Sequence, residues 1–390
     1  MGQDEFAIIG AGHTPFGRLK GETLEDLVVS AGAEAIADAG LTAADIDAVY
    51  LGHFNSGMVT DGFASSLIHQ ISPDLRFKPA TRLENACASG SAAIHAGISS
   101  IASGDARIVL VVGAEKMTAR STKEVTDALA GAGYQNTEEE AGLSFPHVFS
   151  LAAQAYTERY QDPLHAMAQI ASKNHENALR NPLAQMRKSF SVEECDTVSD
   201  NNPVIAPPLR LTDCSLISDG AAALVITTSD VAKTKEGVST FRSRTHVSDY
   251  LPMASRDFAA FEGPELAIRR ALRDADLQLS DLDFAEVHDC FTIAELLIYE
   301  AMGLAPKGEG ARALEDGVVY RDGALPVNLS GGLKAKGHPV GATGVSMHAI
   351  AHRQLTDAAG DLQLPDAKLG LVFNMGGAGV ASYASILQAR

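Results

Sequence analysis

Apolar and polar positions along this chain follow two periods, one typical of buried strands and one of amphipathic helices. Apolar runs predict strands at 6–9, 46–51 and 108–112, and a turn at 218–220 leads into a further apolar run through 225. Helical spacing over 23–40, with acidic residues in the first turn and Gly40 at the end, predicts a helix. This alternation predicts an α/β fold with largely parallel sheets.

The pattern repeats within the chain. The segment 34–47 resembles 270–283, and 105–108 resembles 366–369. Between them, the helix start Cys87-Ala88-Ser89-Gly90 aligns with Gly341-Ala342-Thr343-Gly344. These echoes predict two related halves whose glycine-containing helix starts lie near a shared axis, with Cys87 and His338 facing each other.

One segment departs from the repeat. Residues 119–196 hold a long helical pattern over 149–180 and many polar positions, and we expect them to form an excursion that covers the site. The predicted division is an N-terminal half at 1–118 and 197–240, an inserted loop domain at 119–196, and a C-terminal half at 241–390.

Composition narrows the classes of function. The chain has 390 residues, 46% of them hydrophobic, and a net charge of −18, which argues against a nucleic-acid or anionic-membrane partner bound through bulk electrostatics. No uninterrupted apolar stretch reaches the roughly 18 residues of a membrane span, and the first residues, with Asp4 and Glu5, lack an apolar signal core. Four cysteines without framework spacing fit a reducing compartment, so we expect a cytoplasmic protein.

Cys87 is the first candidate for chemistry. It precedes an apolar helix pattern in a run of small residues, and a helix N-terminus favours the reactive thiolate. The alternative is a buried structural thiol, the commonest fate of a free cysteine. The small neighbours, which leave room for a substrate, favour a nucleophile.

Two further segments carry matching side chains. His288 and Cys290 share a face if their segment is extended, and His338 lies in a glycine-rich loop that suggests close backbone approach. Core or loop packing is the alternative for each. Lys334 and Lys336 beside His338 are either a solvated pair or cations that attract an anionic substrate tail.

Three other possibilities are weaker. A zinc site of His288, Cys290, His338 and Cys87 matches no compact ligand spacing. The run at 10–15 lacks the third glycine of a dinucleotide fingerprint, and a strand-to-loop turn is expected there. Cys195 and Cys214 have no partner of a suitable type nearby in the sequence, so we interpret them as structural.

Taken together, these segments resemble the thiolase superfamily over essentially the whole chain, and most closely its sterol-carrier-protein-type and related bacterial acetyl-CoA acetyltransferase members. The resemblance implies a five-layer αβαβα sandwich of two pseudo-symmetric βαβαβαββ halves with an inserted loop domain, usually as a homodimer or homotetramer. It rests on five motifs in order: Asn85–Gly90, 211–222, His288–Phe291, Gly337–Gly344 and Asn374–Gly379.

The resemblance also implies a division of labour. Cys87 would be the acyl-accepting nucleophile. His338 would activate it as a base and would also help to hold the thioester oxygen, and His288 would stand where many thiolases have an oxyanion-hole asparagine. The backbone N–H groups of Cys87 and Gly376 would form a second oxyanion hole. The substrates would be acyl-CoA and CoA, with no bound cofactor and no metal; the CoA-contacting residues are not specified.

One position departs from most thiolases. Asn374 stands where they carry a second catalytic cysteine, and an amide has no titratable proton in the useful range. In the sterol-carrier-type subfamily the cysteine of the His-Asp-Cys-Phe segment does that work, which implies that Cys290 is the acid/base here.

The leading hypothesis is therefore a thiolase that makes or cleaves 3-oxoacyl-CoA through an acyl-cysteine. A thiolase-like acyltransferase or aldolase with a small OB-fold partner protein is the alternative. A non-catalytic acyl-CoA or lipid binder is the third.

Overall fold

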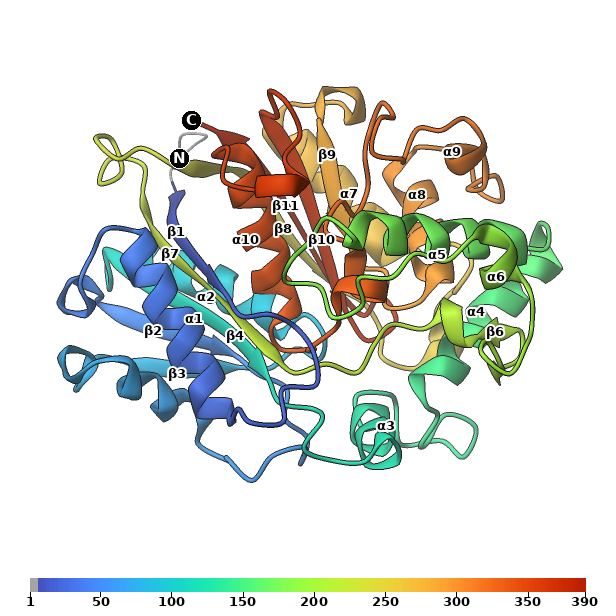
Figure 1. Ribbon diagram of the computed structural model, residues 1–390, viewed down its shortest axis with the longest axis horizontal. Helices are drawn as coiled ribbons and strands as arrows, with labels where there is room; N and C mark the ends of the chain where they lie inside the picture. The colour runs from blue at the N-terminus through green and yellow to red at the C-terminus, as the bar shows by residue number, and fades with distance from the viewer. Residues whose placement is uncertain (1–5) are drawn as a thin grey trace.

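The computed structural model describes residues 6–390, so the expectation based on Asp4 and Glu5 lies outside the described residues. Its centre is a mixed sheet with strand order β3-β2-β4-β7-β1-β8-β11-β10-β9. Two residue pairs, Ala7 with Thr240 and Ile8 with Ser239, join β1 to β8. This short pairing divides the sheet into an N-terminal and a C-terminal half (Figure 1).

The two halves correspond element by element, which confirms the predicted duplication. Val327 bridges to Ala285 beside β9, as β3 pairs beside β2. The N-terminal half contains β1 (Phe6–His13), α1 (Leu24–Asp38), β2 (Ala48–Gly52), β3 (Ala80–Leu83), α2 (Ser89–Ser103), β4 (Ile108–Glu115) and β7 (Gly220–Thr228). The C-terminal half contains β8 (Ser239–Ser248), α7 (Glu262–Ala275), β9 (Phe284–Val287), α8 (Thr292–Met302), α10 (Thr343–Leu355), β10 (Leu369–Gly376) and β11 (Ala381–Ala389).

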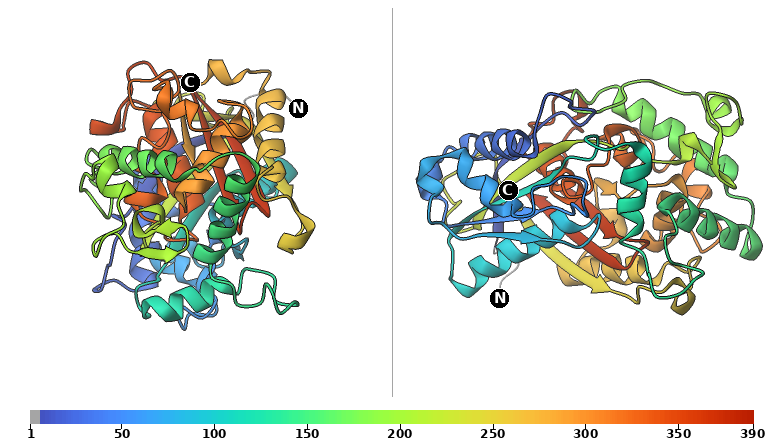
Figure 2. Two further views of the ribbon diagram at one scale, coloured as in Figure 1. Left: turned by 90° about the vertical axis from the view of Figure 1, so that its right-hand side faces the viewer. Right: turned by 90° about the horizontal axis from the view of Figure 1, so that it is seen from below.

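The layers follow from which helices contact which strands. Helix α1 packs on β1, β4 and β7 from outside, and α7 packs on β8 and β11, with α8 beside it. Helices α2 and α10 contact each other and lie between the half-sheets, since α10 contacts strands of both (Figures 1 and 2). The result is the expected αβαβα sandwich, whose central helices start at the two aligned motifs.

The predicted predominance of parallel pairing is wrong. The pairs β2–β3, β2–β4 and β9–β10 are parallel, whereas β1–β7, β1–β8, β4–β7, β8–β11 and β10–β11 are antiparallel. A tight turn over 377–380 joins β10 to β11, and such a short link permits only antiparallel pairing.

The predicted elements of the N-terminal half exist, with shifted ends. Helix α1 begins at a capping box of Thr23 and Asp26. Strand β1 runs to His13 rather than ending at 9, so the expected turn at 10–15 is wrong over its first part. A Cβ on Gly12 would lie 2.1 Å from the Ala31 carbonyl oxygen. These glycines therefore let α1 pack closely on β1, and the sequence signal for a turn has this other cause.

The segment 119–196 forms α3 (Thr122–Ala130), α4 (Phe145–Arg159), α5 (Leu164–Ala178) and α6 (Val192–Asp196), followed by β5 (Val204–Ala206) and β6 (Leu209–Arg210). The single helix predicted over 149–180 is wrong, because the chain breaks ahead of Pro163, which lacks an N–H group. Helices α4 and α5 contact α8 over the C-terminal half (green in Figure 1). The proposed boundaries at 118, 196 and 240 stay a prediction.

Among residues 6–390, none of the helices is both long and apolar enough to cross a bilayer.

Candidate active site

Cys87 lies in a tight turn between β3 and α2. Ala86 has a φ of 49°, in the left-handed region, and the Ser89 hydroxyl secures the turn by accepting the Asn85 N–H and donating to the Ala86 carbonyl. Helix α2 begins at Ser89, as expected. Burial, with a contribution from the Glu115 carboxylate, nevertheless raises the pKa of the Cys87 thiol to about 12. The thiol therefore needs a base to become a nucleophile.

Four predicted side chains from three segments converge here. The ligating atoms of Cys87, His288 and His338 lie within 4.8 Å of one another. The two imidazole rings meet edge to face, with 5.1 Å between their centroids. Cys290 follows His288 by two residues, and burial and then the neighbouring Cys87 raise the pKa of its thiol well above its usual value.

Thr343 determines which ring nitrogen of His338 carries the proton. The Thr343 hydroxyl donates to the Pro339 carbonyl at 3.0 Å, so it accepts from Nδ1 of His338 at 2.7 Å. Nδ1 therefore carries the proton, and Nε2 offers a lone pair. That Nε2 is buried and has no hydrogen-bond partner among the described residues. Burial lowers the pKa of His338 to about 3, which keeps the imidazole neutral and able to accept a proton.

His288 is held in the opposite state by Asn374. The Asn374 amide nitrogen lies 2.9 Å from Nδ1 of His288 and 3.3 Å from the Cys87 carbonyl, which only accepts, and Ser91 donates to the amide oxygen. The amide nitrogen thus donates to Nδ1, so Nε2 carries the proton. This Nε2 is also buried without a partner in the described part of the chain. It can donate to an oxygen in the site.

A metal ion fits this arrangement poorly. One cysteine and two histidines are donors that zinc accepts, but each imidazole must present a lone pair. Nε2 of His288 carries a proton because Nδ1 accepts from Asn374. The hydrogen bonds therefore favour one acceptor and one donor over a pair of ligands.

The predicted oxyanion contribution of Gly376 is not tested by this geometry. The backbone N–H groups of Cys87 and Gly377 both lower the pKa of the Cys87 thiol, so two N–H donors lie at the sulfur. Gly376 itself ends β10 opposite Ala381, one residue earlier.

Supporting residues were missed by sequence reasoning. Asp289 is fully buried and accepts the N–H groups of Leu333 and Lys334 and the amide of Asn174, which ties the His288 segment to the loop that leads to His338. The position of this carboxylate inside the motif His288–Phe291 was the only available signal. It carries no information on which groups the carboxylate binds.

The glycine-rich loop of His338 packs directly on β4. Gly341 donates its N–H to Glu115 at 3.1 Å, and a Cβ there would lie 2.6 Å from the Ala114 carbonyl oxygen. The expected close backbone approach is therefore confirmed, with β4 as the neighbour.

The interpretation of Lys334 and Lys336 as a solvated pair is wrong. Their exposed fractions are 3% and 1%, and both lie in a single π-helical turn, Gly332–Lys336. Lys336 donates to Ser346 at 3.0 Å and lowers the pKa of His338 electrostatically.

The buried histidines predict acid sensitivity. Burial lowers the pKa to about 3 in His175, His338 and His352, and to about 4 in His348. The unfolded chain protonates these groups below its pKa of about 6.5 while the folded chain does not, so stability is lost as pH falls. Together they lower the free energy of unfolding by about 7 kcal/mol between pH 7 and 5. His53, whose pKa is raised, opposes this weakly.

Urea denaturation at pH 7 and pH 5 measures this loss. His352→Asn is expected to reduce the pH dependence of stability. Equal stability at both pH values would contradict the assignment.

Comparisons with known proteins identify the family of this chain. The thiolase N-terminal domain matches residues 6–230, and the thiolase C-terminal domain-like family matches 245–389. An acetyl-CoA acetyltransferase of Methanothermobacter thermautotrophicus is 39% identical, over 96% of this chain and 97% of that protein. Sterol carrier protein 2 of Oryctolagus cuniculus is 31% identical, over 96% of this chain and 70% of that protein.

Among solved structures, the Ltp2-ChsH2(DUF35) aldolase shares the fold, with a TM-score of 0.82 at 23% identity over 99% of this chain and 98% of that one. The family matches span both halves of the sandwich, and the full-length relatives match across the inserted segment as well. The chain belongs to the thiolase family.

Proposed function

We propose that this protein is an acetyl-CoA C-acyltransferase, a thiolase that makes or cleaves 3-oxoacyl-CoA in lipid metabolism. The observation that carries the proposal is the meeting of Cys87 with one imidazole that accepts a proton and one that donates it. CoA thioesters are the substrates, and no resident cofactor takes part. The similarity to proteins named acetyl-CoA acetyltransferase supports the same reaction.

In degradation, Nε2 of His338 takes the Cys87 proton as the sulfur attacks the 3-oxo carbon. The C2–C3 bond breaks, the acyl group stays on the sulfur, and the acetyl-CoA enolate leaves. Cys290 donates its proton to that enolate. A CoA thiol then gives its proton to the Cys290 thiolate and attacks the acyl-cysteine, and the Cys87 sulfur leaves and takes its proton back from His338.

Nε2 of His288 donates to the thioester oxygen on which the enolate charge develops. In synthesis the steps reverse, and Cys290 removes the α-proton of the second acyl-CoA. Both directions therefore need an acceptor and a donor in fixed places.

This geometry predicts the effect of changing Asn374. In Asn374→Asp the carboxylate only accepts, so it draws the proton to Nδ1 of His288 and leaves Nε2 without one. We expect kcat to fall about 10²–10³-fold, the usual cost of losing one oxyanion donor. Asn374→Ala removes the neighbour without reversing the proton and should lose less. Steady-state thiolysis of acetoacetyl-CoA measures both, and a more active Asp variant would contradict the assigned proton.

Thiolysis of acetoacetyl-CoA by the purified chain with free CoA tests the function itself. Consumption of the substrate with formation of two acetyl-CoA supports it. Rates across 3-oxoacyl-CoAs of increasing length would then define the acyl chain. Failure with every chain length, in a folded protein, would refute the thiolase assignment.

An aldolase or acyltransferase with an OB-fold partner protein is the second candidate. It is supported by the fold shared with the Ltp2-ChsH2(DUF35) aldolase. Activity that appears only with such a partner would favour it. The presence of Cys87, Cys290 and His338 favours the thiolase.

We further propose a homodimer in the cytoplasm. Strand β3 forms an end of the sheet next to the Cys87 turn, and a free strand edge is a template for pairing with a second copy. A homotetramer built from such dimers is compatible with this edge. Light scattering would give the number of copies.

A further inference from the structure

A cavity of about 660 Å³ lies between residues 186–202, which span the end of the inserted segment and the residues just after it, and the connector 211–216. Neither cysteine nor either histidine of the active site lines it. It adjoins that site, because Ser215 in its wall donates its N–H to the Cys290 carbonyl at 2.9 Å. Its volume falls in the range of small-molecule sites.

Lys334 is the notable group in this cavity. Its side chain is 97% buried, and its ammonium has no hydrogen bond or ion pair with any residue that the structure describes. The nearby carboxylate of Asp213 is occupied by Arg210 and Thr292. The carboxylates of Asp213 and Asp289 attract the ammonium without a hydrogen bond to it. A buried charge so weakly paired is costly, so its position in a cavity points to a ligand of opposite charge.

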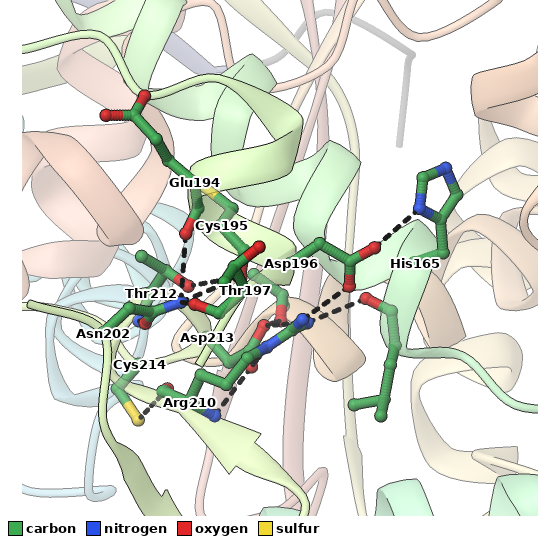
Figure 3. A network of polar contacts seen from close by, with 12 residues as sticks. His165, Glu194, Cys195, Asp196, Thr197, Asn202, Arg210, Thr212, Asp213 and Cys214 are labelled. Carbon is green, nitrogen blue, oxygen red and sulfur yellow. Dashed lines mark hydrogen bonds and ion pairs between the residues drawn. The ribbon is translucent and has the colours of Figure 1, made fainter. Parts of the chain in front are cut away.

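The wall of the cavity is fixed before any ligand binds. The Asn202 amide donates to the carbonyls of Glu194, Cys195 and Thr197 and accepts the N–H of Thr212 at 2.9 Å (Figure 3). The contacts span three helical and loop segments, so the cavity is preorganised.

The lining indicates the kind of ligand. Apolar side chains of Met186, Phe190 and Leu216 accompany the single buried ammonium, and exposed Glu193 and Glu194 contribute negative charge. Such a site suits one anionic group on an apolar body better than a highly charged molecule. Cys214, expected from the sequence to be merely structural, also lines it.

We propose that this cavity binds an organic anion whose carboxylate or phosphate group pairs with the Lys334 ammonium. An organic acid bound here would go beyond the proposed function, whereas CoA bound here would rest on it. A carboxylate would come from an organic acid or an acyl chain, and a phosphate from CoA.

Calorimetric titration of the full chain tests the proposal with hexanoate, hexanol and CoA as probes. Hexanoate or CoA is expected to bind, and Lys334→Met is expected to weaken that binding at least tenfold. Hexanol, which lacks the charge, should bind alike to both proteins. The matched control is Lys188→Met at an exposed lining position, where the loss should stay below threefold. If only the binding of hexanoate depends on Lys334, the group that pairs with it is a carboxylate. If only the binding of CoA depends on Lys334, that group is a phosphate.

Urea denaturation distinguishes a Lys334 that binds an anion from a Lys334 that only stabilises the fold. Because its ammonium has no partner, Lys334→Met should unfold at the same or a higher urea concentration than the wild type. Binding of both anions that is unaffected by Lys334→Met would overturn the proposal, as would binding of neither anion to the wild type. A lower urea midpoint would also overturn it. These readouts need no turnover, so they are independent of a failure of thiolysis.

Discussion

Cys87→Ala is expected to abolish acyl transfer, with kcat for thiolysis falling at least about 10⁴-fold, as for loss of a covalent nucleophile. The reason is geometric, since the Cys87 sulfur lies within 4.8 Å of a ring nitrogen of both histidines. Incubation with acetoacetyl-CoA followed by intact mass measurement should show one added acetyl group on the wild type and none on the variant.

Cys214→Ala is the matched control. This thiol donates only weakly, to the Arg210 carbonyl at 3.5 Å, and lies outside the group of Cys87 and the two histidines. The control should keep acylation and most of the activity. An acetyl adduct on the Cys87→Ala protein would refute the assignment of the nucleophile.

Sequence patterns predicted those elements of the fold in which one apolar face or one hydrophobic periodicity dominates. The duplication was predicted from internal repeats, and α1 from its helical spacing and acidic first turn. The central strands were predicted because apolar runs report burial directly. The length of strand β1 was underestimated, because glycines that permit close helix packing cannot be told from turn glycines in the sequence. The direction of strand pairing depends on connections through a long insertion, which local pattern does not encode.

The candidate site, too, was predicted only in part. Motif likeness selected Cys87, His288, Cys290 and His338, and the fold brings them together. The proton positions were beyond sequence reasoning, because they depend on which neighbour donates to each imidazole. Asn374 was interpreted only as a lost acid/base, whereas its amide orients His288.

The same contrast explains why two histidines stand so close. If both neutral imidazoles presented the same kind of nitrogen to the site, both would accept a proton or both would donate one. Thr343 leaves His338 an acceptor, and Asn374 leaves His288 a donor, so proton removal and oxyanion binding are separated. Burial lowers the pKa of both rings, which keeps both neutral in the free protein until His338 takes the Cys87 proton.

Cys290→Ala is expected to separate acylation from carbon–carbon chemistry. Burial raises the pKa of this thiol well above its usual value, so it is protonated in the free protein and ready to supply a proton to the enolate. The variant should still form the acetyl adduct from acetyl-CoA at Cys87. Condensation to acetoacetyl-CoA should fall at least about 10³-fold, within the range of general acid–base contributions. Intact mass and the rate of acetoacetyl-CoA formation measure the two steps independently.

Cys290→Ser distinguishes chemistry from packing. Serine nearly fills the same space at this 5% exposed position, but its hydroxyl is a far weaker acid than a thiol. If Cys290 moves the proton, the Ser variant should acylate like the wild type and fail in condensation like Ala. If the thiol only packs, the Ser variant should condense at nearly the wild-type rate. That second result would assign the proton transfer to a group other than Cys290. Cys290 would then no longer compensate for Asn374, which stands where most thiolases have their second catalytic cysteine.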